Sequence, residues 1–120
     1  MLTTREVAIA ATKALDSKKG MDIKLLKIDR VSTLADFFLF CTGTSITHVI
    51  TLCDYVEYAV EQVGEPLIGR EGHRGNTWVL LDYGCLVVHV FTDEARKFYD
   101  LERLWADAEV VDLQDIIIEE

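Results

Sequence analysis

The residues best suited to phosphate chemistry are Gly43, Thr44 and Ser45, which follow a short apolar run and precede a helical pattern. Backbone N–H groups at the start of a helix can bind a phosphate. Enzymes that transfer nucleotidyl groups use such a turn, but they also need paired carboxylates on a following strand to hold Mg²⁺. The following strands offer Asp82 alone, without a P-loop or a dinucleotide-binding glycine pattern. A strand–helix turn capped by Ser45 or Thr44 is the simpler interpretation, and a nucleotide-binding enzyme is the alternative.

Nucleophilic catalysis would use Cys41 or Ser45 together with a histidine and a carboxylate. His48 follows Ser45 by three residues, in the first turn of a predicted helix, where a surface histidine is the simpler interpretation. His89 stands among valines in a strand pattern, which favours a partly buried structural histidine. Nothing in the sequence requires a catalytic dyad, and we expect no catalytic residues.

The cysteines and histidines do not form a metal-binding pattern. Cys41, Cys53 and Cys85 are odd in number and distant from one another in sequence, as free buried thiols in a reducing compartment would be. The three histidines are isolated from the cysteines and from each other, so the ligand spacing of a metal site is missing. We expect neither a metal nor another cofactor.

The first half of the chain predicts two helices and two strands. Thr3 starts a helix, because Glu6 completes a capping box, and Gly20 is expected to end it in the left-handed conformation. Residues 22–28 read as a strand. Residues 37–42 are apolar on both faces, which is typical of a central strand covered on both sides. Apolar residues then recur at helical spacing at Ile46, Val49, Ile50, Cys53, Val56, Val60 and Val63.

The second half predicts a loop, a hairpin and two short helices. Residues 69–76 are polar and glycine-rich, which indicates a loop. Residues 77–82 and 85–91 read as strands, and Tyr83-Gly84 between them suits a tight turn. Thr92 and Asp100 are each expected to cap a short helix. Strands interleaved with helices predict a single α/β domain with a mixed β-sheet flanked by helices.

Large apolar side chains gather near the C-terminus in a segment too short to bury all of them. A short helix is unstable alone, so some of these side chains must pack on the domain. The others are expected to form an exposed patch bordered by Arg96, Asp100 and Glu102, and such patches mark protein interfaces. Trp78 is either a core residue or an interface anchor. The clustered residues are Phe98, Tyr99, Leu101, Leu104 and Trp105.

Composition narrows the class of partner. The chain has 120 residues and a net charge of −9, which suits one domain. Phosphate backbones repel an acidic protein, so we expect no direct nucleic-acid binding and favour a basic protein partner.

No apolar run reaches the roughly 18 residues that span a bilayer, and the N-terminal residues lack a signal-peptide pattern. We expect no membrane association and a cytoplasmic location.

Three blocks of sequence together resemble the ribosomal silencing factor family, also called Iojap-like. They are FCTGTSITHV at residues 40–49, WVLLDYGCLVVHVF at residues 78–91 and ARKFYDLERLWADA at residues 95–108. Each block alone is weakly specific, but three in the same order with similar gaps are specific. The likeness extends from about residue 5 to residue 113. We therefore expect one domain over residues 1–113 and an acidic tail over residues 114–120 that packs on the domain or frays.

The resemblance implies a nucleotidyltransferase-like α/β fold without the chemistry of that enzyme class. It implies a protein that binds the large ribosomal subunit at its ribosomal protein number fourteen, blocks joining of the small subunit and represses translation. It further implies a homodimer when the protein is free. The expectation is a binding protein that is not an enzyme.

Carried over position by position, the family's interface pattern falls on the last two strands and the turns after them. Two places depart from it: Thr77 replaces the usual Asp before Trp78, and Tyr83-Gly84-Cys85 replaces the usual Leu-Gly-Asp of the hairpin turn. One acidic contact at each place is therefore expected to be missing. The predicted partner-binding residues are Trp78, Asp82, His89, Arg96, Tyr99, Asp100, Leu101, Glu102 and Trp105.

Overall fold

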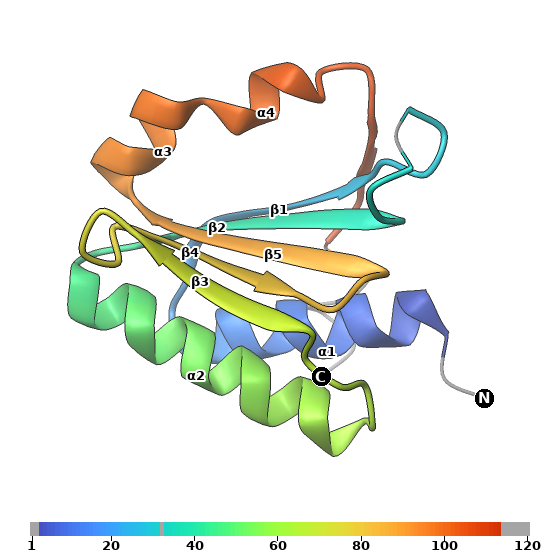
Figure 1. Cartoon of the computed structure of the whole chain (residues 1–120), viewed down its shortest axis with the longest axis horizontal. Coiled ribbons are helices and arrows are strands. Elements are labelled where there is room, and N and C mark those ends of the chain that lie inside the picture. The colour runs from blue at the N-terminus through green and yellow to red at the C-terminus, as the bar shows by residue number, and fades with distance from the viewer. Residues whose placement is uncertain (1–2, 32, 114–120) are drawn as a thin grey trace.

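The computed structural model describes residues 3–31 and 33–113. Within them a six-stranded sheet lies between two layers of helices (Figure 1). The prediction of a single α/β domain with a mixed sheet flanked by helices is confirmed. In chain order the elements are α1 (Thr4–Ser17), β1 (Met21–Lys27), β2 (Phe37–Gly43), α2 (Ile46–Gln62), β3 (Gly69–His73), β4 (Trp78–Asp82), β5 (Leu86–Thr92), α3 (Asp93–Tyr99), α4 (Leu101–Leu104) and β6 (Glu109–Val111).

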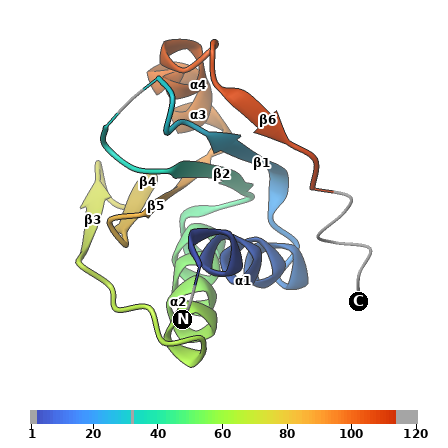
Figure 2. The same cartoon turned by 90° about the vertical axis from the view of Figure 1, so that its right-hand side faces the viewer.

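The sheet places the predicted central strand at its middle. Its strands lie in the order β3-β4-β5-β2-β1-β6. β2 and β5 run parallel, and the other neighbouring pairs are antiparallel. Helices α1 and α2 cover one face of the sheet, and α3 and α4 cover the other (Figure 2). All seven residues of β2 are buried, which confirms a strand covered on both sides.

Each face of the sheet has its own core. Under α1 and α2 the core is largely aliphatic and includes Leu39, Leu52 and Val88. Under α3 and α4 it is largely aromatic and includes Phe38 and Phe40. Alternation along β2 divides the two cores, because successive strand residues point to opposite faces. The aromatic core is the one that positions most of the predicted site residues.

The capping box of the first helix is confirmed, but the prediction for its C-terminal end is wrong. The Glu6 backbone N–H donates to Thr3 Oγ1 at 3.2 Å, and the Thr3 N–H donates to Glu6 Oε1 at 3.4 Å. The left-handed residue after α1 is Lys19, with φ 61°, and not Gly20. Gly20 is needed for a different reason: the backbone at this position lies so close to the Cys41 side chain that a Cβ would be 2.5 Å from Cys41 Sγ.

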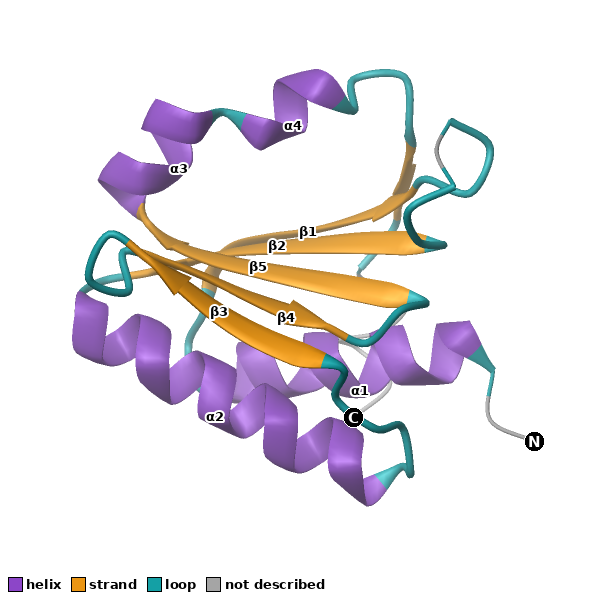
Figure 3. Cartoon of the chain, viewed as in Figure 1, coloured by secondary structure: helices purple, strands orange, loops and turns teal. Residues whose placement is uncertain are grey.

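The stretch that was predicted as a loop contains strand β3, which forms a hairpin with β4 (Figure 3). The side chains of β3 are mostly exposed at the edge of the sheet. An edge strand with no buried face needs no apolar alternation, which is why the sequence pattern failed to indicate it. The turn between the two strands has positive φ at Arg74, Gly75 and Asn76.

The C-terminal part adds an unpredicted strand. β6 pairs antiparallel with β1 and forms the other edge of the sheet. The β4–β5 turn spans residues 83–85, one more than predicted, with Gly84 at φ 81°. The predicted tail at residues 114–120 lies outside the described residues. Across residues 3–31 and 33–113, helices long and apolar enough to cross a membrane are absent.

Candidate functional site

Five aromatic rings form a continuous layer on the sheet face beneath α3 and α4. We call this layer the aromatic face. The rings of Trp78 and Phe91 are stacked with centroids 5.4 Å apart, and those of Phe40 and His89 are stacked at 5.1 Å. Phe38 meets His89 edge-on at 5.0 Å. The layer arises because β4, β5 and β2 are neighbours, and each contributes alternate residues to the same face.

His89 supports the layer from inside. It is only 4% exposed, and its Nδ1 accepts a hydrogen bond from Trp78 Nε1 at 3.2 Å. Burial lowers the pKa of His89 to about 3, so the ring is neutral at physiological pH. This agrees with the structural interpretation of His89 from the strand pattern, and it places this predicted partner-binding residue beneath the surface.

Helices α3 and α4 rest on the aromatic face through three of the predicted site residues. The ring of Tyr99 lies 4.7 Å from that of Trp78, and Trp105 meets Phe38 edge-on at 5.2 Å. Leu101 packs against the same core, and all three side chains are partly buried. The fold therefore brings Trp78, Tyr99, Leu101 and Trp105 onto one face of the sheet, with only part of each side chain open to solvent.

Arg96 and Glu102 form an ion pair that fastens the two short helices to the sheet. Arg96 Nε donates to Glu102 Oε1 at 2.7 Å, while Arg96 Nη1 donates to Thr42 Oγ1 at 2.8 Å and to the Asp22 carbonyl oxygen at 2.7 Å. Lys24 Nζ lies 3.3 Å from Glu102 Oε2. We call Arg96, Glu102 and Lys24 the ionic staple. Arg96 and Glu102 were both predicted to bind a partner. In this structure they bind each other and other residues of the same chain.

The staple also holds Glu102 in its charged form. Partial burial raises the pKa of Glu102, but the hydrogen bond and charge of Arg96, with a smaller contribution from Lys24, lower the pKa below its ordinary value.

Between the helices, Asp100 has a left-handed backbone with φ 47° and makes no side-chain capping hydrogen bond. Asp100 thus occupies the predicted N-cap position of α4 but does not cap the helix with its side chain, and this exposed residue makes the bend between α3 and α4.

The outer surface of α3 and α4 carries two large apolar side chains that the residue-level prediction omitted. Phe98 is 70% exposed and Leu104 is 72% exposed. The composition had indicated an exposed apolar patch in this segment, and the exposure of these two residues confirms that patch. Which residues would face outward was not evident, since Phe98 and Tyr99 are adjacent and similar. We call Phe98, Leu104 and the open parts of Trp78, Tyr99 and Trp105 the α3–α4 patch.

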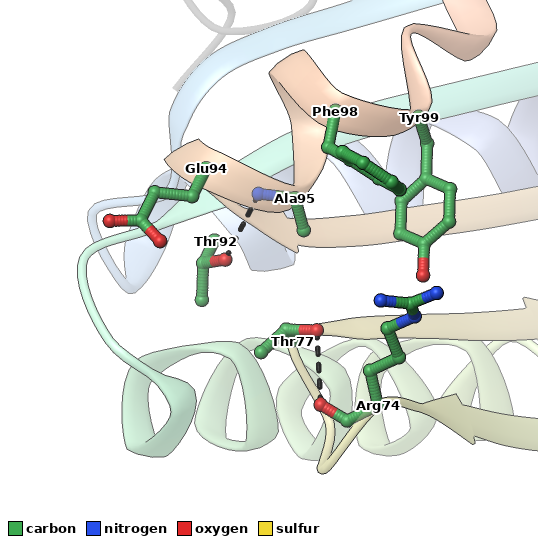
Figure 4. A pocket seen from close by; sticks show the side chains of 7 residues that line it. All are labelled: Arg74, Thr77, Thr92, Glu94, Ala95, Phe98 and Tyr99. Atoms are coloured by element: carbon green, nitrogen blue, oxygen red, sulfur yellow. Dashed lines mark hydrogen bonds between the residues drawn. The ribbon is translucent and has the colours of Figure 1, made fainter.

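A pocket of about 290 Å³ adjoins Phe98. It lies between α3 and the turn from β3 to β4, and the Arg74 guanidinium carbon is 5.5 Å from the centre of the Phe98 ring (Figure 4). Phe98 meets Tyr99 edge-on at 5.2 Å. A polar-rimmed hollow beside an exposed ring suits the insertion of a partner's side chain. The lining residues are Arg74, Thr77, Thr92, Glu94, Ala95, Phe98 and Tyr99.

Asp82 is separate from the other predicted site residues. It ends β4, four residues and about 13 Å along the strand from Trp78. Its Oδ1 accepts a hydrogen bond from the Gly84 N–H at 2.8 Å, which stabilises the β4–β5 turn. The structure therefore gives Asp82 a local role in the hairpin turn, apart from the α3–α4 patch.

The Gly43–Ser45 turn is occupied by structural interactions. Ser45 Oγ accepts from the His48 N–H at 3.1 Å, which confirms Ser45 as the cap of α2. The Thr44 N–H donates to His48 Nδ1 at 2.8 Å, and His48 Nε2 donates to the Lys18 carbonyl oxygen at 2.8 Å. Both imidazole nitrogens are thereby engaged. A Cβ at Gly43 would lie 2.9 Å from Val49, so this glycine serves helix packing.

The surroundings of this turn also oppose phosphate binding and thiol chemistry. Asp93 and Glu94 line the same depression as Thr44 and Ser45, and their charge repels phosphate. Burial raises the pKa of Cys41 to about 12, so this thiol is protonated at neutral pH. In residues 3–31 and 33–113, groups of three or more His, Cys, Asp or Glu side chains that could hold a metal are absent.

The chain matches the family model described as "Ribosomal silencing factor during starvation" over residues 2–120. The ribosomal silencing factor of Halalkalibacterium halodurans is 35% identical over 97% of this chain and 99% of its own length. That of Bacillus subtilis is 35% identical over 93% and 95%. Protein Iojap of the Zea mays chloroplast is 29% identical over 88% of this chain and 46% of its own length.

Solved structures agree with this grouping. A crystal structure of a Chromobacterium violaceum protein has a TM-score of 0.84 and 34% identity over 88% of both chains. A crystal structure of a Bacillus halodurans protein has a TM-score of 0.79 and 34% identity over 91% of this chain and 99% of that chain. The resemblance carried by the three sequence blocks is thus confirmed, and the chain belongs to the ribosomal silencing factor family.

Proposed function

We propose that this protein binds the large ribosomal subunit through its α3–α4 patch, contacts ribosomal protein number fourteen there and keeps the small subunit from joining. The observation that carries the proposal is the exposure of Phe98 and Leu104 on two short helices held firmly over the aromatic face. Among the large apolar side chains of the described residues, Leu104 and Phe98 are the two most exposed, and exposed apolar patches mark protein interfaces. The names of the relatives from Halalkalibacterium halodurans and Bacillus subtilis, which are ribosomal silencing factors, support a ribosomal partner.

The proposal divides the predicted site residues other than Asp82 into two roles. Trp78, Tyr99, Leu101, Trp105 and the exposed Asp100 contact the partner beside Phe98 and Leu104. The buried or inward-facing members hold this surface in place. They are His89, through its hydrogen bond to Trp78, and the ionic staple formed by Arg96 and Glu102 with Lys24.

The mechanism is steric, and no bond is made or broken. The protein binds a free large subunit better than one whose joining surface is covered, and only this difference shifts the joining equilibrium. Each tenfold preference corresponds to about 1.4 kcal/mol. An interface of ordinary size with two or three aromatic or aliphatic anchors is sufficient for such a preference.

Charge supports a protein contact over a direct contact with ribosomal RNA. The net charge of −9 repels phosphates and favours a basic ribosomal protein. The proposal places the protein in the cytoplasm with the ribosomes. It also includes a homodimer of the free protein.

Gradient sedimentation with purified ribosomal particles tests the proposal. The protein should migrate with large subunits and be absent from joined ribosomes and from small subunits. Phe98→Ala and Leu104→Ala should each weaken binding to large subunits by about tenfold.

Tyr58→Ala is the matched control, because Tyr58 is 63% exposed on α2, on the other side of the sheet. It should bind as the unchanged protein does. Equal binding by all three variants, with the fold intact in each, would exclude the α3–α4 patch as the contact surface.

A further inference from the structure

The turn between β3 and β4 brings an arginine to the exposed phenylalanine of the α3–α4 patch. The guanidinium carbon of Arg74 lies 5.5 Å from the centre of the Phe98 ring. Figure 4 shows the guanidinium group beside both Phe98 and Tyr99. Arg74 follows β3, whereas Phe98 belongs to α3, so the contact joins two parts of the chain that β4 and β5 separate.

This turn holds Arg74 in a backbone conformation that is unfavourable for an arginine. Its φ is 48°, in the left-handed region that residues with a Cβ rarely adopt and that recurs at functional sites. The Thr77 hydroxyl donates to the Arg74 carbonyl oxygen at 3.1 Å. The Asn76 side chain lies where a Cβ at Gly72 would be, so it is folded back against β3. These two contacts stabilise the turn that presents Arg74.

The Arg74 guanidinium has no anionic partner within the described part of the chain. It takes part in no ion pair there, and its charge meets only the ring of Phe98. Glu94 lines the same pocket, but its carboxylate points away from Arg74 at the other end (Figure 4). A guanidinium that lies over a ring still presents N–H donors along its edges. These donors are open to an acceptor from outside the chain.

We propose, on the basis of the ribosomal function proposed above, that Arg74 pairs with a carboxylate of ribosomal protein number fourteen while it supports the Phe98 ring. A partner that covers Phe98 also removes water from Arg74, because the two side chains lie together. A buried charge is costly unless it is paired. Since the fold directs no anion at Arg74, the carboxylate comes from the partner. Arg74 is thus a residue that determines specificity at this end of the α3–α4 patch.

The overall charge of the protein separates a direct contact from general attraction. The chain is acidic and its proposed partner is basic, so removing a positive charge should strengthen their long-range attraction. Removing Arg74 should nevertheless weaken binding, because its guanidinium meets a carboxylate directly. The two effects have opposite signs, and a control that removes an arginine elsewhere shows the first effect alone.

Binding to purified large subunits, measured by sedimentation, makes this comparison. Arg74→Gln should weaken binding by about fivefold to tenfold, because charge-assisted hydrogen bonds are lost. Arg74→Lys keeps the charge without the planar fork and should weaken binding by about twofold to threefold. Arg5→Gln is the matched control, at an exposed position of α1 on the other side of the sheet. It should bind at least as tightly as the unchanged protein.

Two further measurements address the partner group and the ring. Arg74→Glu should bind more than tenfold more weakly, and reversing one acidic residue of ribosomal protein number fourteen to arginine should restore its binding. In the free protein, the NMR signals of the Arg74 δ-methylene protons should be shifted by the Phe98 ring and should lose this shift in Phe98→Leu. Arg74 is exposed, so its variants should keep the unfolding midpoint of the unchanged protein.

Full binding by Arg74→Gln, when Phe98→Ala binds weakly, would overturn this inference and leave the proposed function intact. An equal loss of binding in Glu94→Gln would show that Glu94 supplies the anion, and would also overturn it. If no acidic reversal in the ribosomal protein restores Arg74→Glu, the acceptor is an RNA phosphate and the carboxylate is excluded. Unchanged protein that does not bind large subunits would overturn both proposals.

Discussion

The Trp78 indole donates a hydrogen bond to His89 Nδ1 at 3.2 Å, across the neighbouring strands β4 and β5. Because Nδ1 accepts this bond, the proton of the neutral imidazole lies on Nε2, which is buried without a partner among the described residues. The ring of Tyr99 packs against that of Trp78, with the two ring centroids 4.7 Å apart. The α3–α4 patch therefore depends on a histidine that must remain uncharged.

This relationship predicts a loss of stability in mild acid. Burial lowers the pKa of His89 to about 3, whereas an unfolded histidine has a pKa of about 6.5. The unfolded state binds more protons between these values, so the contribution is complete above about pH 6.5 and is lost as pH falls toward 3. At pH 5 the unfolding free energy should be lower by up to about 2 kcal/mol from this group.

Urea denaturation at pH 7 and pH 5 measures the effect. His89→Leu should show a smaller decline between the two pH values than the unchanged protein, and His73→Gln should retain the full decline, because His73 lies at the partly exposed end of β3. If His89→Leu and the unchanged protein lose the same free energy, the assigned role of His89 is wrong.

The ionic staple predicts that Glu102 acts through folding. Glu102→Lys places a third cation beside Arg96 and Lys24, and should lower the unfolding free energy by about 1–3 kcal/mol. Glu94→Lys, at an exposed position of α3, should change it by less than about 0.5 kcal/mol. Thermal and urea unfolding provide the comparison. A fully stable Glu102→Lys variant that fails to bind large subunits would instead show that Glu102 contacts the partner directly.

Gly20 should tolerate no side chain. A Cβ at this position would lie 2.5 Å from Cys41 Sγ and 3.0 Å from the Leu15 carbonyl oxygen. Gly20→Ala should therefore destabilise the protein by about 1–3 kcal/mol through overpacking. Gly69→Ala is the matched control, since a Cβ there would meet no atom within 4 Å. Equal unfolding midpoints for the two variants would contradict the close contact between α1 and β2.

The turn at Gly43, Thr44 and Ser45 should not bind nucleotides. The Thr44 N–H and both nitrogens of His48 are already hydrogen-bonded, and Asp93 and Glu94 line the same depression. Calorimetry with ATP or CTP in the presence of Mg²⁺ should give no heat beyond dilution. A saturable heat that disappears in a Ser45→Ala variant would favour the alternative of a nucleotide-binding enzyme.

Much of the fold could be predicted because burial leaves a periodic pattern. The apolar run at 37–42 indicated a doubly covered strand, and the spacing of Val49, Cys53, Val56 and Val60 indicated α2, because each set follows the geometry of its element. β3 was missed because it buries no side-chain face and is fixed by backbone pairing with β4.

The site was predicted at the level of the segment and not of each residue. Composition indicated that helices so short could not bury every large side chain, and this was right. It could not indicate that Phe98 faces outward while its neighbour Tyr99 rests on Trp78, because that depends on how α3 is rotated against the sheet, with Ala95 and Tyr99, one turn apart, on its inner side. Nor could it show that Arg96 and Glu102 pair with each other.

The most direct measurement is the rate and extent of subunit joining, followed by light scattering after purified large and small subunits are mixed. Large subunits incubated with the unchanged protein should join slowly and incompletely. The doubly substituted Phe98→Ala, Leu104→Ala protein should leave joining almost as fast as in its absence, and Tyr58→Ala should inhibit as the unchanged protein does. Unimpeded joining in the presence of saturating unchanged protein, or equal inhibition by the double variant, would contradict steric exclusion through α3 and α4.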